Sequence, residues 1–95
     1  MKHLAIGTLK AMSPEQQQHF MPLEVPATLQ FYLDGHMDQF WFRQERSGVF
    51  FVMSTDTREQ ADTMLKNLPL GRAGLLTFEL IELGPLAPLG MLIKH

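Results

Sequence analysis

The chain has 95 residues, of which 45% are hydrophobic, and its 8 basic and 10 acidic side chains give a formal charge of −2. This length fits one domain with a modest core, and the charges form no basic stripe of the kind that binds nucleic acid. The absence of cysteine excludes disulfides and thiolate metal sites, and the apolar N-terminal run is too short to span a membrane. We therefore expect a soluble cytoplasmic protein that binds neither nucleic acid nor membrane.

The N-terminal part of the chain predicts a strand followed by a long helix. Residues 2 to 9 alternate between apolar and more polar or small positions, as in a strand with one buried face. Ser13, followed by proline, begins the helix, because its hydroxyl can cap the helix and proline is tolerated at the first helical position. The helix runs towards Gly35, and we expect Pro22 and Pro26 either to kink it or to divide it into two shorter helices.

The central stretch predicts a β-hairpin whose strands are apolar on both faces. Residues 36 to 44 form the first strand, 45 to 48 the turn and 49 to 54 the second strand, with aromatic and β-branched residues enriched in both arms. The helices of the same chain can cover one face of such a sheet, but 95 residues leave little material for the other face. The hairpin therefore predicts that a second copy of the chain covers it.

The C-terminal part predicts a second helix, a last strand and an apolar arm. A capping box at residues 56 to 59 begins an amphipathic helix that Pro69 closes. Residues 75 to 83 form the fourth strand, so the predicted fold is α+β, a ferredoxin-like βαββαβ unit with an antiparallel sheet and both helices on one face. We assign residues 1 to 83 to this domain. Residues 84 to 95 form an arm that covers a neighbouring subunit or an open barrel end, or else a disordered tail.

Several short motifs share their spacing with one protein family. They are the helix start at Ser13, the helix end at Gly35, Trp41 in the hairpin, and a helix that ends in Leu-Pro-Leu at residues 68 to 70. On these residues the chain resembles the muconolactone isomerase family of the dimeric α+β-barrel superfamily, as a divergent member. The resemblance implies a homodimer, alone or within a larger ring, and a cofactor-independent isomerase that shifts a double bond in a lactone by proton transfer.

The resemblance also suggests where a ligand, a lactone or an aromatic-derived acid, would bind. It places a helix glutamate at Glu24, whose pKa burial would raise into the range of a general base; the alternative is a solvated glutamate. Trp41 and Arg43 share a parity on their strand and can offer an aromatic wall and a cation to a carboxylate, although Arg43 can equally pair with an acid of the hairpin or of a partner chain. Tyr32 and Glu79 are further ligand-binding candidates, and each also fits a purely structural role.

Two departures from the family pattern favour a second hypothesis. Phe42 stands where the family has an arginine directly after the tryptophan, and Gly84 stands where it has the histidine of a His-Pro pair. In this hypothesis the chain is a non-catalytic dimeric module for ligand binding or interaction, and its aromatic sheet face is the subunit seam. A cofactor-free monooxygenase of the same superfamily is a third interpretation, because fold does not fix function. None of these needs a cofactor, and the histidines lack metal-ligand spacing, so we expect no metal.

Overall fold

The computed structural model describes residues 1 to 85, which form four strands and three helices. In chain order these are β1 (Lys2–Leu9), α1 (Pro14–Leu33), β2 (Met37–Phe42), β3 (Gly48–Ser54), α2 (Arg58–Lys66), α3 (Pro69–Arg72) and β4 (Leu76–Leu83). The sequence predicts every element except α3, whose first position is Pro69, where proline loses no helical hydrogen bond. The predicted arm lies almost entirely outside the described residues.

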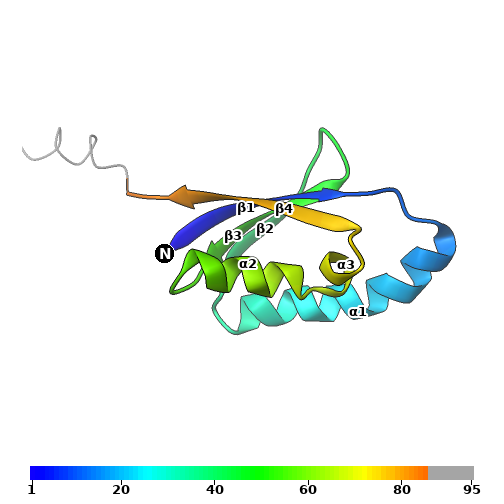
Figure 1. Ribbon diagram of the computed structural model, residues 1–95, viewed down its shortest axis with the longest axis horizontal. Coiled ribbons are helices and arrows are strands. Elements are labelled where there is room, and N and C mark those ends of the chain that lie inside the picture. The colour runs from blue at the N-terminus through cyan, green and yellow to red at the C-terminus, as the bar shows by residue number, and fades with distance from the viewer. Residues whose placement is uncertain (86–95) are drawn as a thin grey trace, which may run out of the picture.

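The four strands form one antiparallel sheet in the order β2-β3-β1-β4. Figure 1 shows α1, α2 and α3 together on one side of this sheet, with no helix of the described chain on the other. The predicted fold class, an α+β unit with an antiparallel sheet and its helices on one face, is confirmed. Because β2 is an edge strand, the space between β2 and α1 opens to solvent.

Helix α1 is one continuous helix of 20 residues. The Ser13 side chain accepts a hydrogen bond from the Gln16 backbone, and the Gln16 side chain accepts one from the Ser13 backbone, which is the predicted capping arrangement. Pro22 and Pro26 both lie inside the helix, so the predicted division into two shorter helices does not occur. Both prolines are on the exposed side, where water can bind the carbonyls that they leave unpaired.

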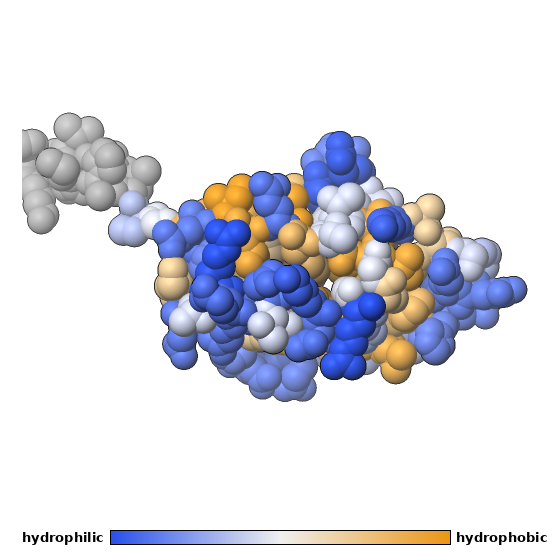
Figure 2. Space-filling model, viewed as in Figure 1, coloured by the Kyte–Doolittle hydropathy of each residue, from blue (hydrophilic) through white to orange (hydrophobic). Residues whose placement is uncertain are grey.

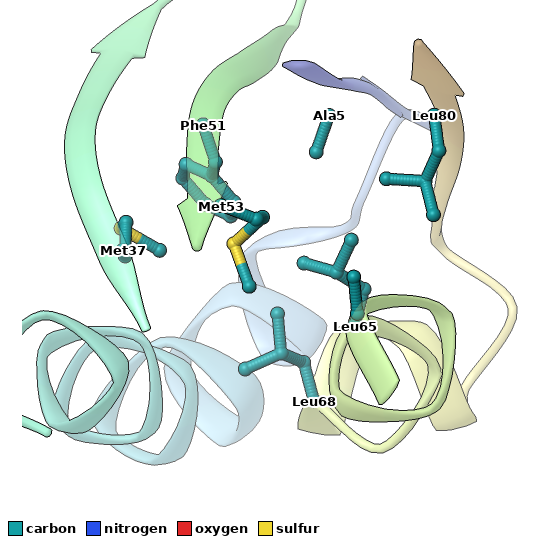
Figure 3. Close-up of a cluster of buried hydrophobic side chains, with 8 residues drawn as sticks. Ala5, Met37, Phe51, Met53, Leu65, Leu68 and Leu80 are labelled. Atoms are coloured by element: carbon teal, nitrogen blue, oxygen red, sulfur yellow. The ribbon is translucent and has the colours of Figure 1, made fainter. Parts of the chain in front are cut away.

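The core lies between the sheet and the helices. Figure 3 shows Phe51 and Met53 of β3 pointing from the sheet towards Leu65 and Leu68 of the α2–α3 region. These four side chains are at most 3% exposed. Such burial of large apolar side chains is the main source of stability for a domain of this size.

The face of the sheet that points away from the helices is also apolar. The register places Ile6 of β1 beside Phe50 of β3, and Phe50 in turn beside Trp41 of β2. Ile81 of β4 shares this face and is 44% exposed. Figure 2 shows hydrophobic surface over the sheet where β1 and β4 lie, and again along α1. We refer to this uncovered side as the open face.

Candidate functional site

A groove of about 630 Å³ lies between α1 and the strands β2 and β3, on the helix side of the sheet. Besides Trp41, four of the residues that border it have polar side chains, namely Glu24, Thr28, Arg43 and Ser47. The rest of the lining is apolar or glycine. A concave, mostly apolar surface with a few polar groups is the usual form of a small-molecule site.

The groove has one wall on the helix and one on the edge strand. Val25 and Leu29, one helical turn apart, face it from α1 and are about half exposed. Phe40 and Phe42 face it from β2, because Phe40 pairs with the core residue Phe51 and Phe42 has the same parity. Phe42 is 79% exposed, so the aromatic rim of the groove is open to solvent.

Glu24 sits at the inner end of this groove and is 5% exposed, the only fully buried residue of α1. Its Oε1 accepts a hydrogen bond from the backbone N–H of Leu70 at 2.9 Å, which ties the carboxylate to α3. Its Oε2 accepts a longer bond, 3.4 Å, from the hydroxyl of Thr28 one turn along the helix. Oε1 is therefore anchored, whereas Oε2 is only weakly held and is the oxygen better able to exchange a proton.

The surroundings of Glu24 favour its neutral form. Burial raises the pKa of the Glu24 carboxyl above its usual value, and the hydrogen bonds from Leu70 and Thr28 oppose this only in part. Within residues 1 to 85, no lysine, arginine or histidine forms an ion pair with it. Glu24 is thus in the buried setting that the sequence analysis described for a general base, and it is not solvated. Its catalytic role stays a prediction.

Trp41 and Arg43 lie together, as their parity predicts, but their side chains belong to the open face. Trp41 pairs with Phe50, and the guanidinium carbon of Arg43 lies 5.1 Å from the centre of the Phe50 ring. Both residues border the groove along β2. Since strand side chains alternate, the sheet itself separates these two side chains from Glu24.

The guanidinium of Arg43 makes four hydrogen bonds within the chain. It donates to both carboxylate oxygens of Glu45, at 2.8 and 3.1 Å, and a further nitrogen donates to the Thr8 hydroxyl at 3.1 Å and the Gly7 carbonyl at 3.3 Å. The pKa of Arg43 is raised and that of Glu45 is lowered, in both cases mainly by their mutual hydrogen bonds. The alternative that Arg43 pairs with an acid of the hairpin is therefore what the structure shows.

The two remaining candidates are not beside Glu24. Tyr32 is 46% exposed on α1 and packs edge-on against Phe40, with ring centres 5.6 Å apart, so it stands next to the aromatic rim of the groove. Glu79 of β4 pairs with Ile6, which places it on the open face, and it is exposed. The ligand-binding roles of Tyr32 and Glu79 stay predictions.

Two groups at the site are absent from the sequence-based candidates. Thr28 follows Glu24 by four residues, and helical periodicity alone could have placed it at the carboxylate. No sequence pattern predicts that the Leu70 backbone N–H reaches Glu24, because its position depends on how α3 packs against α1. Among the described residues no three histidine or acidic side chains are grouped as a metal site would require. None of the described helices has the length and apolar character needed to cross a membrane.

Comparison with known proteins supports the fold. No family model and no curated protein matches the sequence. The solved structure of muconolactone isomerase has a TM-score of 0.74 to this chain at 20% identity, covering 90% of each. The 5-chloro-2-hydroxyhydroquinone dehydrochlorinase of Burkholderia phenoliruptrix AC1100, solved with 2,5-dihydroxybenzoquinone, has a TM-score of 0.70 at 13% identity and covers 88% of this chain and 94% of its own. The predicted resemblance to muconolactone isomerase is thus confirmed for the fold.

Proposed function

We propose that this protein is a cofactor-independent enzyme that shifts a double bond in a small unsaturated lactone by proton transfer, with Glu24 as the group that carries the proton. The observation that supports this most directly is the buried Glu24 carboxylate, which opens onto an apolar groove and has no cation beside it among the described residues. A carboxyl group whose pKa is raised by burial is a stronger base when ionised, and perturbed carboxyl groups in clefts are characteristic of catalytic sites.

The chemistry needs one group that both accepts and donates a proton. In our proposal, Oε2 of ionised Glu24 takes a proton from the ring carbon at one end of the unsaturated unit, and the electron pair moves into a dienolate on the lactone carbonyl oxygen. The protonated carboxyl then returns the proton to the carbon at the other end. One C–H bond breaks and another forms, nothing is oxidised or reduced, and Glu24 ends ionised as it began.

Two further observations agree with this proposal. The two solved structures compared above are, by name, enzymes that act on small ring compounds, one an isomerase and the other a dehydrochlorinase. The aromatic rim formed by Phe40 and Phe42 offers flat apolar surface for such a ring. The hydrogen bond from Leu70 holds the carboxylate in one orientation, which proton transfer to a bound ring requires.

The proposal is tested by following the loss of the conjugated absorbance of muconolactone with the wild type and with Glu24→Gln. Glutamine can still accept the Leu70 hydrogen bond but cannot take up a proton, so we expect kcat to fall by about 100-fold or more. The matched control is Glu15→Gln, since Glu15 lies exposed in the first turn of the same helix. Equal activity in the wild type and Glu24→Gln would contradict the role of Glu24.

We also propose that the protein works as a homodimer whose subunits pair through the open face. Ile6, Phe50 and Trp41 form an apolar row across this face, and no helix of the described chain covers it. Only Arg43 of the hairpin lies over part of the row, at Phe50. Pairing would remove this surface from water while leaving the Glu24 groove on the opposite side of the sheet. In the non-catalytic alternative the same pairing occurs, but neither lactone conversion nor an effect of Glu24→Gln is expected.

A further inference from the structure

We infer that the ligand of the Glu24 groove is uncharged: a neutral unsaturated lactone or a closely similar ring carbonyl compound, not a carboxylic acid. This inference rests on the proposed function and specifies its substrate class. It differs from the expectation, drawn from the sequence, that Arg43 receives a carboxylate. It follows from where the charges around the groove lie.

The groove contains one acidic side chain and no available cation among the described residues. Arg43 is the only basic residue along its lining. The hydrogen bonds of its guanidinium go to Glu45, Thr8 and Gly7, and its contact with Phe50 holds it on the open face. The charge of Arg43 is therefore already balanced by Glu45, and it points away from the space that a ligand would occupy.

Phe42 occupies the place from which a cation could have reached the ligand. It follows Trp41 directly and therefore points to the helix side of β2, where its ring forms part of the rim. This side chain supplies apolar surface and no charge. The strand thus presents an aromatic ring to the groove, and Arg43, which directly follows the strand, lies on the opposite face.

A carboxylate in this groove would meet an unfavourable environment. It would lose water against apolar side chains and would stand near the ionised form of Glu24, and both effects disfavour its binding. It would also raise the pKa of Glu24 further, which reduces the fraction of the enzyme that can act as a base. A neutral ring avoids both penalties, and the Ser47 hydroxyl in the lining can donate to its carbonyl oxygen.

The test compares muconolactone with its methyl ester, which differ by the charge of one group. The change in absorbance as the double bond leaves conjugation gives kcat/KM for each compound under the same conditions. We expect kcat/KM for the methyl ester to exceed kcat/KM for muconolactone, whose carboxyl group is ionised at neutral pH, by about tenfold or more. The reason is that the ester lacks the unfavourable charge interaction with Glu24.

The variant Phe42→Arg sharpens this test by placing a cation on the groove side. We expect it to raise kcat/KM for the acid and to narrow or reverse the preference for the ester, mostly through KM. Phe42→Leu is the matched control, because it removes the aromatic ring without adding charge and should keep the preference for the ester. The side chain is 79% exposed, so both variants are expected to fold, and thermal unfolding verifies this.

Each outcome has a definite meaning. Preference for the ester that Phe42→Arg weakens and Phe42→Leu retains supports the inference. Equal conversion of both compounds, or preference for the acid, overturns the inference while the proposed function stands. Conversion of neither compound by the wild type contradicts the proposed function and the inference together.

Discussion

The charged residues on the two sides of the sheet differ in whether an opposite charge lies beside them. On the helix side, Glu24 is buried, and among residues 1 to 85 it receives hydrogen bonds only from neutral donors and has no opposite charge beside it. On the open face, Arg43 is matched by Glu45 and stacked on Phe50. The first arrangement keeps a carboxyl group reactive, whereas the second fixes the hairpin. Burial without an opposite charge raises the pKa of Glu24, and this agrees with the proposal that Glu24 carries the proton.

The largest effect should come from a substitution that disrupts the proposed dimer interface on the open face. We predict that Ile81→Lys converts the dimer into a monomer at micromolar concentration, because it places a charge in an apolar contact. Ile81 is already 44% exposed in the single chain, so the domain itself should remain folded. Light scattering measures the mass. Leu33→Lys on α1, at a residue 68% exposed, is the control and should leave the dimer intact. A wild-type monomer would contradict the pairing through this face.

The next effect concerns the pH dependence of stability. The pKa of Glu24 is raised in the folded protein, so the folded state binds more protons than the unfolded state between the two pKa values. The free energy of unfolding should therefore fall as pH rises through this range. Glu24→Gln should lack this fall, and its stability relative to the wild type should be greater at neutral than at acidic pH. Urea unfolding from about pH 4 to pH 8 measures the difference. Parallel curves for the two proteins would show that the Glu24 pKa is not raised.

The rate of proton transfer should rise with pH, whereas the free energy of unfolding falls. The ionised form of Glu24 is the base, so kcat should rise as pH rises through its raised pKa and then level off. Initial rates on a lactone across the same pH range give this profile. A rate that falls over this interval would mean that a protonated group, and not ionised Glu24, starts the reaction.

The smallest effect should come from Arg43→Gln. This change removes the pair with Glu45 but leaves the groove side of β2 as it is. We predict a loss of stability, because the Arg43 side chain is only 9% exposed and its bonds to Thr8 and Gly7 are also lost. The change in kcat should be severalfold at most, far below that of Glu24→Gln, because Arg43 lies on the face of the sheet opposite Glu24. Thermal unfolding and steady-state kinetics measure both. A loss of kcat as large as that of Glu24→Gln would contradict this prediction and would indicate that Arg43 takes part in the reaction.

The sequence predicts most of the fold because local chemistry determines it. The hydroxyl of Ser13, the alternation of β1 and the apolar hairpin each specify an element without reference to the rest of the chain. The prolines at 22 and 26 were harder to interpret, since their cost depends on whether water reaches the carbonyls that they free. The α3 turn was missed because Pro69 can either follow a helix or begin one.

The site was less predictable because it depends on which side of the sheet each side chain faces. The parity of Trp41 and Arg43 shows that they share a face, but parity alone does not say which face the helices cover. The register with β3 and the contact between Phe40 and Tyr32 decide this, and both are tertiary facts. The Leu70 donor to Glu24 joins groups 46 residues apart and has no local signal.

The most direct test of Glu24 as the proton carrier is exchange of the lactone ring protons for deuterium. Muconolactone methyl ester would be incubated with the wild type or Glu24→Gln in deuterium oxide and followed by NMR, so proton removal is seen even where the net double-bond shift is small. We predict that the wild type exchanges the proton at the reacting ring carbon well above the buffer rate and that Glu24→Gln does not. Exchange at the same rate in both proteins, or neither exchange nor conversion above the buffer rate in either, would contradict the account.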